Sequence, residues 1–151
     1  MNHPALAPAL DYLDRHHVMT LATCGARGPW AAAVLYVRDG TRLCFVSSPA
    51  SRHGADLAAD ARAAATVQDD EPDWRVIRGV QLEGRVEVLA GAEEERVRAL
   101  YGARFAVAAG GAGTPAPIAA ALARARWYAL TPDALYLVDN AVAFGHRARV
   151  L

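Results

Sequence analysis

The sequence predicts a mainly β protein, built as a small antiparallel barrel of about six strands with a few flanking helices. Apolar and polar residues alternate from Val80 to Leu89, which is the pattern of a strand with one buried and one solvated face. Asp39-Gly40 is a strong hairpin signal between two apolar runs. Helical spacing of apolar residues is confined to short segments, so strands dominate the predicted architecture.

The first part of the chain reads as a helix followed by three strands. Leu6, Leu10 and Leu13 recur at helical spacing, and Pro4 suits the first turn of a helix. The segment from Gly25 to Pro29 has the composition of a turn, and Asp39-Gly40 marks the next one. The predicted elements are a helix at 4–15 and strands at 18–23, 30–37 and 42–46.

The chain is organised around the stretch from Leu43 to His53. Its apolar run ends at Ser47-Ser48-Pro49, because Pro49 has no N–H to give to a sheet. A helix then begins at Ser51, capped by Ser51 or Ser48, and ends near residues 60–62. A strand that stops in hydroxyl groups, followed by a helix start carrying Arg52 and His53, predicts an anion site. The alternative is a plain turn with a capping serine and two solvated side chains.

The second part of the chain alternates strands and helices. Gly84 predicts a bulge or bend in the strand at 80–89. In the helix at 92–105, glutamates come first and arginines follow, and Val97, Leu100 and Tyr101 share a face. The other predicted elements are a strand at 64–67, an acidic loop at 68–73, a flexible glycine-rich loop at 109–114, a helix at 115–125, strands at 127–130 and 135–138 around a turn, and an irregular tail from 139.

Composition favours one folded domain over residues 1–151. Hydrophobic residues make up 54% and charged residues 21%, so the chain can bury a sizeable core and does not belong to the disordered class. The formal net charge is zero, so no broad basic surface favours nucleic acid or an anionic membrane as a partner.

The sequence also indicates a cytoplasmic protein. The N-terminus, Met-Asn-His-Pro, lacks the basic and apolar regions of a signal peptide, and no apolar run reaches the ~18 residues that a membrane span needs. Cys24 and Cys44 lie in apolar, strand-like surroundings, outside any Cys-x-x-Cys motif or Cys/His cluster. We expect both to be buried, reduced thiols.

Three motifs, in this order, resemble a known family. They are His17-Val18-Met19-Thr20-Leu21, Ile77-Arg78-Gly79-Val80-Gln81, and the tail from Val138 to His146. With Ser-Arg-His opening a helix between them, the arrangement resembles the FMN-binding split barrel of the pyridoxamine 5'-phosphate oxidase-like superfamily, and most closely its YhbP-like branch. The resemblance covers most of the chain. It implies FMN as the cofactor, with a deazaflavin cofactor or haem as alternatives, and a homodimer that holds the flavin at the subunit interface.

The resemblance also implies positions that bind the cofactor. The residues that would run alongside the isoalloxazine, mostly through backbone atoms, are Ala31, Ala32, Ala33 and Tyr36. Those that would meet the ring edge, the ribityl chain or the phosphate are Val46, Ser47, Ser51, Arg52 and His53, with Arg52 and His53 on the phosphate. Gly79 falls where the oxidase has a glutamine beside the flavin, and Trp127 where it has a flavin-contacting tryptophan. Several of these would serve the partner's site.

The chain departs from the oxidase at its substrate-binding positions. Ala31 and Tyr36 replace basic residues, and His53 replaces a lysine at the phosphate, which makes phosphate affinity more dependent on pH. The C-terminal Arg-x-His pair has no clear counterpart. We therefore expect a flavin-dependent oxidoreductase that acts on a small unidentified substrate, and not a pyridoxamine-phosphate oxidase. The alternatives are a flavin- or haem-binding sensor or store without turnover, and a deazaflavin-dependent reductase.

Other side chains indicate no second chemistry. His16-His17 and His146 are candidate metal or haem ligands, but no pair has zinc-type spacing, and we expect no metal site. A related split-barrel group binds haem through a C-terminal histidine, which keeps that option open for His146. No Ser/His/Asp or Cys/His order identifies a catalytic residue. Trp30 and Trp127 are either core residues or cofactor stackers.

Overall fold

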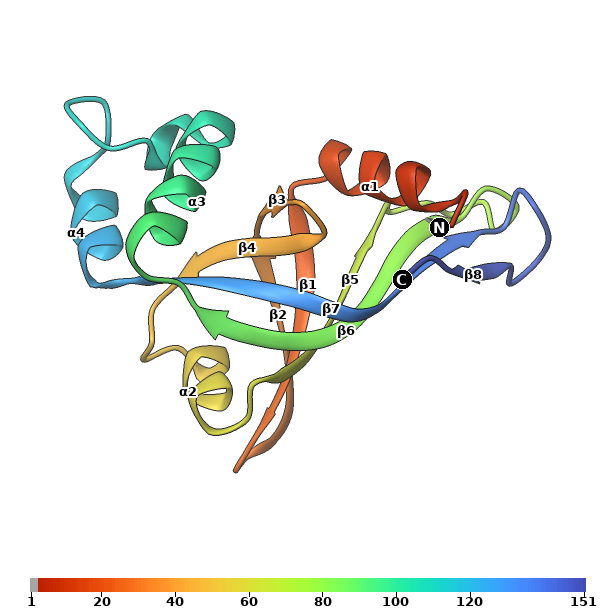
Figure 1. Cartoon of the computed structure of the whole chain (residues 1–151), viewed down its shortest axis with the longest axis horizontal. Coiled ribbons are helices and arrows are strands. Elements are labelled where there is room, and N and C mark those ends of the chain that lie inside the picture. The colour runs from red at the N-terminus through yellow and green to blue at the C-terminus, as the bar shows by residue number, and fades with distance from the viewer. Residues whose placement is uncertain (1–2) are drawn as a thin grey trace.

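The computed structural model describes residues 3–151, which form one curled, fully antiparallel sheet with helices around it (Figure 1). The helices in this range are α1 (Leu6–Arg15), α2 (Arg52–Ala59), α3 (Gly91–Arg104), the short 3-10 helix η1 (Ala106–Ala108) and α4 (Ala116–Arg124). The strands are β1 (Val18–Gly25), β2 (Gly28–Leu35), β3 (Val37–Asp39), β4 (Arg42–Ser47), β5 (Arg62–Gln68), β6 (Arg78–Val88), β7 (Arg126–Asp139) and β8 (Arg147–Arg149). Their order across the sheet is β2-β1-β5-β6-β7-β4-β3, and β8 pairs with β7.

The sheet curls into a half-barrel because consecutive strands lie at its two ends. β2 and β3 are joined by Tyr36 alone, yet they stand at opposite ends of the strand order. Tyr36 turns the chain inward: its N–H donates to the carbonyl of His17 (3.0 Å), and its buried hydroxyl donates to the carbonyl of Leu13 (2.6 Å). The expected strand at 30–37 is therefore two strands, and the described residues form eight strands where about six were predicted.

Buried side chains form two clusters on the two faces of β4 and β7. The larger cluster fills the curl of the sheet beneath α1 and α2 and includes Phe45 and Tyr128. The smaller cluster lies between the sheet and α3 and includes Cys44, Trp127 and Tyr101. Because side chains alternate along a strand, successive residues of β4 and β7 enter different clusters. This alternation decides which site residues can meet.

The long strand β7 corrects one prediction. Residues 127–130 and 135–138 belong to a single strand, and the segment between them is no turn. The predicted irregularity at Gly84 is present: Glu83 pairs with Ala134 and Gly84 with Pro132, so Asp133 of β7 is the extra, unpaired residue. Pro132 has no N–H for the ladder, and this bulge in β7 opposite Gly84 lets the strand pass that point without ending.

Three further expectations need correction. The tail is not wholly irregular, because Arg147–Arg149 forms β8 against β7. Cys24 is exposed near the tip of the β1–β2 hairpin, while Cys44 is buried as expected. On α3, Val97 and Tyr101 are buried, but Leu100 is 40% exposed, because the helix covers the sheet with a narrow face only.

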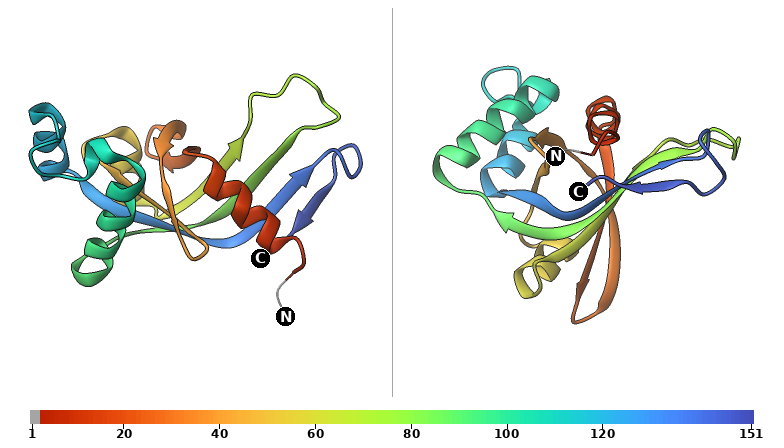
Figure 2. Two further views of the ribbon diagram at one scale, coloured as in Figure 1. Left: turned by 90° about the horizontal axis from the view of Figure 1, so that it is seen from above. Right: turned by 45° about the vertical axis from the view of Figure 1, so that its right-hand side comes forward.

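The molecule is elongated. α3 and α4 lie together at one end, by the start of β7, while α1 lies over the middle of the sheet, and the β5–β6 and β7–β8 loops extend the opposite end (Figures 1 and 2). Within residues 3–151, no helix is long and apolar enough to cross a membrane.

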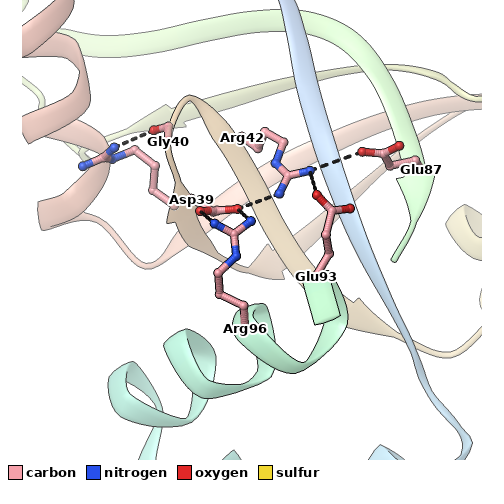
Figure 3. Close-up of polar contacts among 7 residues, drawn as sticks. Asp39, Gly40, Arg42, Glu87, Glu93 and Arg96 are labelled. Atoms are coloured by element: carbon pink, nitrogen blue, oxygen red, sulfur yellow. Dashed lines mark hydrogen bonds and ion pairs between the residues drawn. The ribbon is translucent and has the colours of Figure 1, made fainter. Parts of the chain in front are cut away.

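A network of charges fastens α3 to the β3–β4 hairpin (Figure 3). Asp39 accepts from the guanidinium groups of Arg42 (2.6 Å) and Arg96 (2.8 Å). Arg42 also contacts Glu87 and Glu93 at 3.3 and 3.4 Å. The side chains of Asp39 and Arg42 are only 13% and 17% exposed, so water screens this pair less than a surface pair.

We expect Asp39→Asn to lower the free energy of unfolding by roughly 1–3 kcal/mol, because it leaves two arginines without their shared carboxylate. Urea unfolding of both proteins measures the loss. The control is Asp73→Asn, which breaks an exposed pair with Arg75 inside one loop and should cost less than ~1 kcal/mol. Equal losses in the two variants would contradict a fastening role for Asp39.

Candidate functional site

Hydroxyl groups and one imidazole gather where β4 ends and α2 begins. Ser47 Oγ and His53 Nε2 share a hydrogen bond of 2.6 Å, and Ser47 Oγ lies 3.4 Å from Ser51 Oγ. Ser51 donates its own proton to the carbonyl of Ser48 (2.7 Å). The predicted residues Ser47, Ser51 and His53 are therefore brought together, which the spacing of the sequence anticipated.

The start of α2 offers free backbone donors beside these groups. Ser51, one of the two predicted caps, is the N-cap, and its Oγ accepts from the N–H of Gly54 (3.1 Å). Within the described residues, the amides of Arg52 and His53 have no acceptor. At Gly54 the turn packs against the helix so tightly that a Cβ would lie 2.6 Å from the Ser48 carbonyl oxygen. Free amides at a helix start attract anions.

Arg52 points away from Ser47 and toward the β1–β2 hairpin. Its guanidinium carbon lies 4.3 Å from the centre of the Trp30 ring, and its Nη2 donates to the carbonyl of Arg27 (3.2 Å). Its Nε is buried and lacks a hydrogen-bond partner among the described residues. Arg52 therefore combines a stacked, ordered guanidinium with one donor that remains unsatisfied.

The surroundings of His53 disfavour the charged form of its imidazole. Burial lowers the pKa of His53 below its usual value, and the nearby carboxylate of Asp56 opposes that shift. Asp56 is itself buried and accepts a hydrogen bond from the hydroxyl of Thr23 (2.9 Å). That bond fixes α2 against β1, and with it the position of His53.

The strand β2 adds an unpaired backbone edge to this region. β2 pairs with β1 only, so within residues 3–151 no strand covers its other edge, and it also contacts α2 and β4. Ala31 and Ala33 point out of the sheet and are exposed, while Ala32 is half-buried. Small side chains beside an unpaired edge leave backbone N–H and C=O groups open to a flat ligand.

Four predicted site residues lie elsewhere in the same chain. Val46 and Trp127 are paired across β4 and β7, on the face opposite to Ser47. Gly79 is buried near the start of β6, about 30 Å along the strand from Val88, which pairs with the part of β7 that pairs with β4, at ~3.3 Å per residue. The Tyr36 side chain lies in the core, and burial raises its pKa. One chain alone does not bring these four to Ser47.

One of the candidate metal ligands, His16, is engaged in other contacts. His16 Nδ1 bonds to the carbonyl of Tyr12 and Nε2 to Asp69, both at 2.7 Å, so two acceptors hold the ring. The hydroxyl of Tyr12 also donates to Asp69 (3.1 Å). Across residues 3–151, no group of three or more histidine, cysteine or acidic side chains is placed to hold a metal ion. This cluster ties the end of α1 to the acidic loop.

Comparison with known proteins identifies the family. A family model described as pyridoxamine 5'-phosphate oxidase matches residues 7–139. The chain belongs to the pyridoxamine 5'-phosphate oxidase family. A UPF0306 protein from Klebsiella pneumoniae is 31% identical over 144 residues, which are 94% of this chain and 90% of that protein. The sequence resemblance to this family, including its YhbP-like branch, is thereby confirmed.

Solved structures of the pyridoxamine 5'-phosphate oxidase-like fold confirm the split barrel. A heme-binding protein from Mycobacterium smegmatis matches with a TM-score of 0.75 and 24% identity, over 99% of this chain and 59% of that one. An FAD-binding protein from Mesorhizobium loti matches with a TM-score of 0.65 and 16% identity, over 86% of this chain and 91% of that one. At these identities the likeness shows the fold alone.

Sequence reasoning missed the residues that support the site. It did not predict that the Arg52 guanidinium stacks on the ring of Trp30, or that the hydroxyl of Thr23 donates a hydrogen bond to Asp56. An acidic residue inside an otherwise apolar helix was a signal for Asp56, because buried acids need a partner. Trp30 carried no such signal, since its contact with Arg52 depends on how the hairpin folds back.

Proposed function

We propose that the chain binds flavin mononucleotide at the start of α2 and acts as a flavin-dependent oxidoreductase on a small substrate. The observation that supports this most directly is the cluster of free donors beside an unpaired strand edge. The amides of Arg52 and His53 and the hydroxyl of Ser47 offer donors to a phosphate. The edge of β2 offers backbone groups to a flat ring system.

The residues present fit a flavin phosphate. The buried Nε of Arg52 lacks an acceptor, and a phosphate oxygen would supply one. Arg52 and His53 would hold the phosphate, Arg52 through charge-assisted hydrogen bonds, with Ser51 as a neighbour, and Ala31 to Ala33 would leave room for the ring. A bound flavin supplies the electron transfer, while the protein orients it and excludes competing reactions. The imidazole of His53 beside Ser47 can hold or release a proton at Nε2.

We also propose that the flavin site is shared between two copies of the chain. The outer face of the sheet bears a stripe of apolar side chains on neighbouring strands: Val18 pairs with Leu35, and Ala22 with Ala31 and Ala64. Val18 and Leu35 are 48% and 42% exposed. A second copy would cover this stripe, and the Trp127 and Gly79 of one copy would then serve the site of the other.

A charge in this stripe should separate the copies. We expect Leu35→Glu to convert a homodimer into a monomer, because a carboxylate in an apolar interface loses its water without gaining a partner. Light scattering at micromolar concentration measures the mass. Leu100→Glu, on the exposed face of α3, is the control and should leave the dimer intact. A monomeric mass for the unmodified protein would contradict the shared site.

The pH dependence of FMN binding tests the role of His53. Burial lowers the pKa of the free His53, and a bound phosphate dianion should raise it. Because the bound-state pKa is the higher one, the extra affinity is fully present below the free-state pKa and is lost as pH rises through the bound-state pKa. FMN affinity should therefore fall with rising pH between the two values, by at most about tenfold per unit.

Fluorescence titrations between pH 6.5 and 8.5 measure this slope. The lower limit keeps the phosphate mostly dianionic, since its second ionisation lies near ~6. His53→Lys should flatten the slope and keep the affinity, since its charge persists across this range. Equal slopes in the two proteins would show that His53 does not touch the phosphate.

The absorbance spectrum of the purified protein tests the cofactor itself. Flavin bands that NAD(P)H bleaches support the oxidoreductase, and flavin bands that no donor bleaches support a binding protein. A sharp band near 400 nm would support haem, which the exposed His146 would be the candidate to hold. Mass spectrometry of the released ligand separates FMN from a deazaflavin cofactor.

A further inference from the structure

A hollow of about 400 Å³ lies between α3, the loop after η1, and α4. Its size falls in the range of small-molecule sites. The helices that line it, α3 and α4, lie together at one end of the molecule (Figure 2). Trp127 lines it from the face of β7 opposite to Ser47, so it is separate from the flavin site proposed above within the same chain.

Two buried hydrogen-bonding groups line this hollow without a partner. The indole N–H of Trp127 and the hydroxyl of Thr114 are both buried, and neither forms a hydrogen bond with any described residue. Trp127 as a whole is only 3% exposed. An indole N–H can only donate, so whatever satisfies it must carry an acceptor. Unsatisfied buried groups of this kind are rare in folded proteins and require an explanation.

A cation lies at the rim of the same hollow. The guanidinium carbon of Arg98 is 5.3 Å from the centre of the Trp127 ring. Its Nε donates to Glu94 (2.9 Å), and the side chain is 50% exposed, which leaves its Nη groups for a ligand. No carboxylate occurs among the described residues that line the hollow. Its polar groups therefore favour an anionic acceptor.

The remaining residues that line the hollow are apolar, and most have small side chains. They consist of Leu122, Gly110 and five alanines, and within the described range α4 contributes no buried residue. Side chains of α4 therefore do not fill the space. Apolar walls with a few convergent polar groups are the usual construction of a small-molecule pocket.

We propose that this hollow binds a small apolar carboxylate, such as an aromatic acid. The carboxylate accepts from Trp127 and Thr114 and faces Arg98, while the apolar part of the ligand contacts the alanines and Leu122. This inference does not use the donors at the start of α2, because the hollow lies on the opposite face of β7. Trp127 is the one residue that it shares with the flavin site proposed for the partner copy.

The test is a titration of the full chain with 2-naphthoate, followed by ligand-observed NMR, with 2-naphthalenemethanol as the uncharged probe. We expect 2-naphthoate to bind and 2-naphthalenemethanol to bind at least about tenfold more weakly. Trp127→Phe keeps an aromatic ring and removes the N–H, and it should weaken 2-naphthoate binding about tenfold or more. Thr114→Val should weaken it severalfold. Trp74→Phe, in the exposed loop at the other end, should change nothing.

Three results would overturn the proposal. One is the absence of saturable 2-naphthoate binding, and another is unchanged affinity in both Trp127→Phe and Thr114→Val. The third is displacement of 2-naphthoate by FMN, which would assign the hollow to a flavin site. If Trp127→Phe does not fold, the 2-naphthoate affinities of Thr114→Val and Arg98→Gln are compared with that of the unmodified protein instead. Riboflavin affinity measured in Thr114→Val and Arg98→Gln should stay constant, which separates this pocket from a failure of the flavin proposal.

Discussion

Replacing Gly84 with alanine should lower the free energy of unfolding by at least ~3 kcal/mol. A Cβ at this position would lie 2.0 Å from the carbonyl oxygen of Thr131 and 2.9 Å from the Cα of Pro132. Both are backbone atoms of the neighbouring strand, so no side-chain rotation relieves the contact. β6 or β7 must shift, and these two strands share the longest pairing in the sheet.

The melting temperature should accordingly fall by roughly 6–12 °C, at about 2–4 °C per kcal/mol for a domain of this size. Differential scanning calorimetry measures the shift. Gly113→Ala is the matched control, because a Cβ there meets nothing within 4 Å, and its melting temperature should stay within about 2 °C of the original. A Gly84→Ala protein with an unchanged melting temperature would mean that the two strands do not approach so closely.

Gly84 also shows why some of the fold could be predicted and some could not. The irregularity at this position was predictable, since a glycine inside an alternating strand is a local signal. The continuity of β7 was not, because Thr131 and Pro132 have the composition of a turn, and β7 continues past them by a bulge at Asp133 while it stays paired with β6. Pairing between distant strands overrode the local signal.

The candidate site likewise has some features that the sequence could predict and others that it could not. The cap at Ser51 and the approach of His53 to Ser47 follow from a turn of a few residues, so the sequence was sufficient to predict them. The separation of Val46 from Ser47 was also predictable, because neighbouring residues of a strand point to opposite faces. The direction of the Arg52 side chain was not, since its ring partner Trp30 comes from a hairpin whose folding depends on the whole sheet.

Arg52→Ala should weaken FMN binding by roughly one to two orders of magnitude. A charge-assisted hydrogen bond to a phosphate contributes ~1.5–3 kcal/mol, which corresponds to that factor. The structure adds a competing explanation, because Arg52 also stacks on Trp30 and bonds to the carbonyl of Arg27. Loss of the stacking alone should cost about 0.5–1 kcal/mol of stability and could loosen the hairpin.

Riboflavin separates the two explanations, because it has the ring and ribityl chain of FMN but no phosphate. If Arg52 holds the phosphate, Arg52→Ala should weaken FMN binding and leave riboflavin binding unchanged, as measured by fluorescence quenching of each ligand. Trp30→Leu should destabilise the hairpin without this difference between ligands. Arg62→Ala, an exposed arginine paired with Asp60 just after α2, should affect neither ligand. Equal weakening of FMN and riboflavin by Arg52→Ala would instead assign Arg52 to the hairpin, leaving the helix amides and hydroxyl groups to hold the phosphate.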